Sequence, residues 1–178
     1  EYPATASLAF RSVTDDPFIT PNLVMSAINN TFRDQHGPLI IGVDPADKGP
    51  DRTAIVFRRG RMVPKILTYQ GRSTMEVTGI VSSLIAEHAP DAVFIDAIGI
   101  GAGIADRLKE LGHKVIPVYS GMAASDNKVY ANKRAEMWGR VREWLAEPPV
   151  RMPNDSALIS DLTAPGYRHD SSGRILIE

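Results

Sequence analysis

Two aspartates each stand at the end of a short apolar run, a position that could support metal-dependent chemistry. Leu39-Ile40-Ile41-Gly42-Val43 is followed by Asp44, and Ala92-Val93-Phe94-Ile95 is followed by Asp96. Apolar runs bounded by Gly and Pro predict buried strands. A carboxylate at the end of such a strand is costly without a cationic partner. If the two strands are neighbours, their tips lie roughly 5 Å apart, and both carboxylates could reach one ion.

A divalent cation is the partner that this pair of carboxylates favours. Two like charges so close together would raise one pKa sharply if nothing neutralised them. The chain has no cysteine and no histidine cluster, and oxygen ligands favour Mg²⁺ or Mn²⁺ over Zn²⁺. Such ions can activate water and hold the attacking and leaving oxygens of a phosphodiester. The alternative for each Asp is that it only caps the following turn or helix.

The loop after Asp44 holds two further carboxylates, Asp47 and Asp51. Either could add an outer ligand to the same cation or could only shape the turn. Asp51 is the better candidate for a ligand because it directly precedes the returning strand.

The elements expected around these residues form a mixed α/β sheet. Strands are predicted at 39–44, 52–59, 62–69, 92–96 and 114–119, and helices at 73–88, 104–111 and 131–145. Three consecutive strands followed by strand–helix alternation predict a mixed sheet of five or more strands with helices on both faces. Residues 1–37 are expected to form a linker or docking segment with a helix at 21–32, and residues 38–178 the main domain. A short helix at 155–162 and a hairpin at 167–177 complete that domain.

Composition gives no global electrostatic reason for nucleic-acid binding. The chain has 178 residues and a formal net charge of −1, so such binding would need a local basic patch. The candidates are Arg58 and Arg59 at a hairpin tip, and Lys128, Lys133 and Arg134 near the start of the long helix. For each group the alternative is an ordinary solvated surface. No apolar run approaches the ~20 residues of a membrane span, and no signal peptide is visible.

Two further patterns concern packing. Gly99, Gly101 and Gly103 could cradle a phosphate at a helix N-terminus, but their spacing departs from G-x-G-x-x-G. Close backbone packing beside Asp96 is therefore favoured over a nucleotide pocket.

The helix at 131–145 is expected to bury an apolar face, whose members are Met137, Trp138, Val141, Trp144 and Leu145.

Three segments together resemble the nuclease domain of tailed-phage terminase large subunits. They read GVDPADKGPDRTAIVFRRG, FIDAIGIGAGIADRLKELG and NKRAEMWGRVREWL, and the resemblance covers roughly residue 38 to the end. It implies a ribonuclease H-like fold and two-metal, Mg²⁺- or Mn²⁺-dependent cutting of concatemeric double-stranded DNA during genome packaging. The family's first two acidic positions match Asp44 and Asp96, and Asp51 matches a further acidic position of some members.

The resemblance also implies features that lie outside this sequence. The family takes a third acidic residue from a helix beyond the last strand, and the chain stops at Glu178 before any such stretch, so a truncated C-terminal part is expected. No ATPase motif occurs. The implied partners are an ATPase domain, a small terminase subunit and the portal protein, with no membrane, and the implied location is the host cytoplasm.

Two other functions remain open at this point. The Gly42-x-Asp44 hairpin with Thr53 also opens the nucleotide-binding lobe of the actin and sugar-kinase type. A protein of that type would also need a second lobe and a Gly-rich loop for adenosine, and this sequence shows neither. A non-catalytic module that binds DNA or a portal protein is the other alternative.

Overall fold

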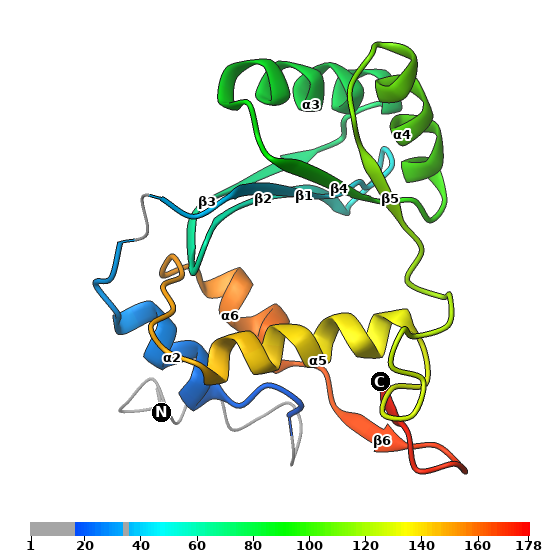
Figure 1. Cartoon of the computed structure of the whole chain (residues 1–178). Coiled ribbons are helices and arrows are strands. Elements are labelled where there is room, and N and C mark those ends of the chain that lie inside the picture. The colour runs from blue at the N-terminus through cyan, green and yellow to red at the C-terminus, as the bar shows by residue number, and fades with distance from the viewer. Residues whose placement is uncertain (1–16, 34–35) are drawn as a thin grey trace. The chain divides into compact units, whose positions relative to one another are not determined.

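A computed structural model describes residues 17–33 and 36–178, which cluster into two compact units (Figure 1). One unit is formed by residues 33–120. The other combines residues 121–178 with the described part of residues 1–32. The linker or docking segment expected at residues 1–20 lies mostly outside the described residues. The division into residues 1–37 and 38–178 stays a prediction.

The unit of residues 33–120 is built on a mixed five-stranded sheet, as the sequence predicts. Its strands are β1 (Leu39–Asp44), β2 (Arg52–Arg59), β3 (Met62–Gln70), β4 (Ala92–Asp96) and β5 (Ile116–Val118). Their order in the sheet is β3-β2-β1-β4-β5. The central strand β1 is antiparallel to β2 and parallel to β4. Consequently β1 and β4 end at the same edge of the sheet.

Two helices, α3 (Thr74–His88) and α4 (Ile100–Glu110), pack side by side against one face of this sheet (Figure 1). The predicted capping box opens α3, because the Ser73 hydroxyl accepts from the Glu76 N–H and the Glu76 carboxylate accepts from the Ser73 N–H. Between helices and sheet lies an apolar core that includes Ile41, Ile55 and Ile95, all fully buried. This core fixes which side chains of each strand face the helices.

The helix α4 begins four residues earlier than the sequence predicts, at Ile100 instead of Ile104. Gly101 and Gly103 are part of the helix and do not form a loop. The reason is close packing: a Cβ at Gly101 would lie 1.7 Å from the backbone oxygen of Asp96. Only glycine lets the first turn of α4 approach the end of β4, as the preferred interpretation of these glycines expects.

The second unit is mainly helical. It contains α2 (Pro21–Asn29), α5 (Lys133–Ala146), α6 (Ser156–Thr163) and a hairpin of β6 (Tyr167–His169) and β7 (Ile175–Ile177). Helix α2 packs against α5 and α6, and α5 packs against β7. No helix among the described residues is long and apolar enough to cross a membrane.

The apolar face predicted for α5 is buried only in part. Leu145 is buried and Val141 is 38% exposed. The other three members, Met137, Trp138 and Trp144, are half-buried. The helix also buries Ala135, Glu136 and Gly139, which the prediction did not include. Position 139 needs glycine because Tyr130 packs so closely that a Cβ there would lie 2.2 Å from the Tyr130 hydroxyl oxygen.

Candidate metal centre

Asp44 and Asp96 lie next to each other at the edge where the parallel strands β1 and β4 end. The register pairs Val43 with Ile95, so the two aspartates follow as the next residues on adjacent strands. Val43 and Ile95 belong to the core under α3 and α4. Because side chains alternate along a strand, both carboxylates belong to the sheet face opposite these helices.

The Asp44 carboxyl group lies in an environment that disfavours its negative charge. Burial raises the pKa of the Asp44 carboxyl group, and repulsion by the Asp96 carboxylate raises it further. Part of Asp44 is exposed, so its carboxyl group lies at the boundary between protein and solvent. Two partly desolvated like charges at this position suit a cation, which would remove the repulsion.

Backbone groups hold the Asp96 side chain and the strand end behind it. The Ile98 N–H donates to Asp96 Oδ1 at 3.0 Å, and the Ala97 N–H donates to the Val118 carbonyl at 2.8 Å. The first bond directs one carboxylate oxygen toward the backbone. The second bond ties the segment after Asp96 to the end of β5.

Thr53 positions the loop that follows Asp44, a role that sequence reasoning missed. Its side chain is buried, and its hydroxyl accepts from the Ala46 N–H at 3.0 Å and donates to the Ala46 carbonyl at 3.4 Å. The available signal was a lone threonine at the start of an apolar strand. That signal does not reveal a partner seven residues earlier.

The oxygen ligands of this pair fit Mg²⁺ or Mn²⁺, although the described residues supply only two carboxylates. Among residues 17–33 and 36–178, no group of three or more His, Asp or Glu side chains is placed to hold a metal. Asp51 is exposed and precedes β2, whose Ala54 is the residue paired with Asp44. Asp51 therefore lies three residues before Ala54, the residue beside Asp44 in the sheet. Its role as a metal ligand stays a prediction.

The candidate DNA-binding arginines lie at the opposite end of the sheet from Asp44. Register pairs Asp44 with Ala54, whereas Arg58 pairs with Ile40, so four residues, or roughly 13 Å along the strand, separate them. The Arg58 guanidinium donates to the Gly60 carbonyl at 2.7 Å, and the Arg59 guanidinium donates to the Gly37 carbonyl at 3.1 Å. The structure does not bring these arginines to the carboxylate edge.

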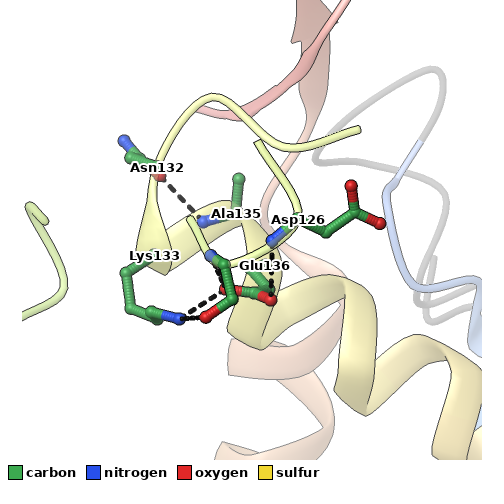
Figure 2. A network of polar contacts seen from close by, with 6 residues as sticks. Asp126, Asn132, Lys133, Ala135 and Glu136 are labelled. Carbon is green, nitrogen blue, oxygen red and sulfur yellow. Dashed lines mark hydrogen bonds and ion pairs between the residues drawn. The ribbon is translucent and has the colours of Figure 1, made fainter. Parts of the chain in front are cut away.

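Lys133, at the start of α5, is held in an internal polar network (Figure 2). Its ammonium group donates to Glu136 Oε2 at 2.5 Å and to Ser125 Oγ at 2.8 Å. Glu136 also accepts from the backbone N–H groups of Ser125 and Asp126. The Lys133 ammonium group, then the Ser125 N–H, lower the pKa of Glu136. The Lys133 charge is therefore largely compensated, whereas Arg134 and Lys128 are exposed.

Comparison with known proteins gives likenesses in structure. No protein-family model and no curated protein matches the sequence. The nuclease domain of the large terminase subunit gp2 of bacterial virus Sf6 superposes with a TM-score of 0.78 at 19% identity, covering 91% of this chain and 87% of that chain. The large terminase nuclease of thermophilic phage G20c, with bound magnesium, gives a TM-score of 0.68 at 16% identity, with 93% and 88% covered. This chain therefore has the ribonuclease H-like fold of phage large-terminase nuclease domains.

Proposed function

We propose that this chain is a metal-dependent endonuclease domain that hydrolyses the phosphodiester bonds of double-stranded DNA. The observation that carries the proposal is the placement of Asp44 and Asp96 on adjacent parallel strands, where the Asp96 carboxylate helps to raise the pKa of Asp44. The fold supports it, because Sf6 gp2 nuclease structures with manganese and a G20c nuclease structure with magnesium share this architecture. A fold alone does not determine a function, so the carboxylate pair is the deciding feature.

In this proposal Asp44 and Asp96 hold Mg²⁺ or Mn²⁺, with two ions as the full complement. The bound ions would supply an activated water and neutralise charge at the scissile phosphate. The chain's own contribution is to fix the ligands: the Ile98 N–H orients Asp96, and Thr53 holds the loop behind Asp44. The biological substrate would be concatemeric viral DNA, cut during genome packaging alongside an ATPase domain, a small terminase subunit and a portal, in the host cytoplasm.

The test is plasmid cleavage in Mn²⁺ by the wild-type chain, Asp44→Asn and Asp96→Asn. Each substitution keeps the side-chain volume but removes a charged ligand, so cutting should fall at least about 100-fold. Asp161→Asn is the matched control, because Asp161 is an exposed aspartate on α6, and it should cut like wild type. Equal cutting by all four proteins would sink the assignment.

A second function, a non-catalytic module that binds DNA, is favoured by one observation. The described residues bring two carboxylates together, and no third. In that case the wild-type chain would bind a DNA duplex and leave plasmid intact at every Mn²⁺ concentration. The same cleavage series, run beside a binding assay, separates the two functions.

A further inference from the structure

Outside the carboxylate pair, the helical unit has a polar depression of about 480 Å³ lined by Asn127, Lys128, Ser172 and Arg174. Two segments far apart in the sequence form it: the loop that leads into α5, and the turn between β6 and β7. We propose that this depression binds one backbone phosphate of a DNA strand. The inference rests on the proposed function, because it assigns a contact to the substrate of that function.

Backbone hydrogen bonds fix the two segments to each other. The Ile175 N–H donates to the Val129 carbonyl at 2.8 Å, and the Ala131 N–H donates to the Ile175 carbonyl at 2.9 Å. They form an isolated parallel bridge between Tyr130 and Ile175. Lys128 and Arg174 directly precede these bonded residues. Their backbones are therefore held at a set separation on either side of the depression.

The Arg174 guanidinium is oriented in advance by Asp170. Asp170 Oδ2 accepts from Arg174 Nε at 2.8 Å and pairs with Nη2 at 2.7 Å. Asp170 Oδ1 accepts from the backbone N–H groups of Ser172 and Arg174, at 2.9 Å each. These hydrogen bonds, first those from Arg174, lower the pKa of Asp170. The guanidinium N–H donors that Asp170 leaves open are held in place, so they lose little conformational freedom when they meet an anion.

The lining suits a singly charged oxyanion. All four lining side chains carry hydrogen-bond donors, and no carboxylate lines the depression. Asp170 balances the charge of Arg174, whereas exposed Lys128 forms no ion pair with any described residue. The net charge of Lys128, Arg174 and Asp170 together is therefore +1, which matches the −1 of a phosphodiester. Lys, Arg, Ser and Asn are the side chains that commonly contact phosphate oxygens in DNA complexes.

The experiment measures binding of a fluorescent DNA duplex in EDTA, where cleavage cannot occur, across a series of salt concentrations. Lys128→Ala should weaken binding about 3- to 10-fold and lower the slope of log K against log salt by about 1. Lys128→Glu should weaken it further. Lys114→Ala is the matched control, because Lys114 is an exposed lysine in the other unit, and it should bind like wild type. Arg174→Lys keeps the positive charge but loses the planar guanidinium. Its affinity for the duplex should fall between those of the wild type and Lys128→Ala.

Three outcomes would overturn the inference. One is unchanged affinity and salt slope in both Lys128 variants; another is an equal loss in Lys114→Ala. The third is binding of inorganic phosphate at the depression, detected by NMR shifts of Ser172 and Arg174, with duplex affinity unchanged in the Lys128 variants. Because the assay needs no cleavage, failure of the nuclease assignment shows separately, as equal plasmid cutting by wild type and Asp44→Asn.

Discussion

At the residue scale, Asp44 carries a conflict between stability and function. Burial and the neighbouring Asp96 carboxylate raise its pKa above the ordinary 3.8. The folded chain therefore binds a proton more tightly than the unfolded chain does. Stability consequently falls as pH rises from about 3.8 through the raised value. Above that range, without a cation, the ionised pair destabilises the fold.

Asp44→Asn should therefore stabilise the cation-free protein while abolishing cleavage. The amide removes the repulsion with Asp96 at similar volume. Solvent screening limits the gain to about 1 kcal/mol at most. Thermal unfolding at pH 8 in EDTA measures it, and the gain should shrink toward pH 4. A melting temperature of Asp44→Asn below that of wild type at pH 8 would contradict the destabilising repulsion between Asp44 and Asp96. The control Asp161→Asn should leave the melting temperature unchanged.

At the scale of elements, the approach of α4 to the end of β4 depends on one glycine. A Cβ at Gly101 would lie 1.7 Å from the backbone carbonyl oxygen of Asp96 and 3.3 Å from Pro45 Cγ. Gly101→Ala should therefore push the helix away and lower the free energy of unfolding by about 1–3 kcal/mol. It should also reduce cleavage, because it displaces the backbone of Asp96. Urea unfolding and the plasmid assay measure the two effects.

Gly103→Ala is the matched control for this prediction. It lies in the same helix, and nothing within 4 Å would meet its Cβ. Alanine should stabilise the helix there by about 0.5–1 kcal/mol. Equal destabilisation by both substitutions would contradict the prediction, because alanine is the better helix former and only the side chain at position 101 would meet the end of β4.

The same elements show which features sequence reasoning could reach. The strands around Asp44 and Asp96 were predicted because short apolar runs and the shared edge of parallel strands follow from local pattern. The buried face of α5 was predicted only in part, because its interface also uses Gly139 and the charged Glu136. The backbone partners of Glu136 lie in a loop 10 and 11 residues earlier. The position of Arg58 at the far end of the sheet follows from strand register, which its neighbours in sequence do not reveal.

At the scale of the whole molecule, the two compact units should respond differently to a cation. Both carboxylates belong to residues 33–120, and a ligand stabilises the structure that holds it. At ten times its dissociation constant, Mn²⁺ should add about 1.4 kcal/mol of stability there. Hydrogen exchange measured by mass spectrometry should therefore slow in peptides of β1 and β4, while peptides of α5 and α6 exchange as before.

The same measurement on Asp44→Asn decides whether the effect belongs to the carboxylate pair. This variant should show no slowing in β1 and β4 at the Mn²⁺ concentration that protects the wild-type chain. Slowing confined to residues 121–178 would place the cation elsewhere and contradict the proposed centre. Lower pH should weaken the wild-type effect, because protons compete with the cation for the carboxyl group of Asp44, whose pKa is raised. The cation, the proton and the fold are thus linked through one pair of strand ends.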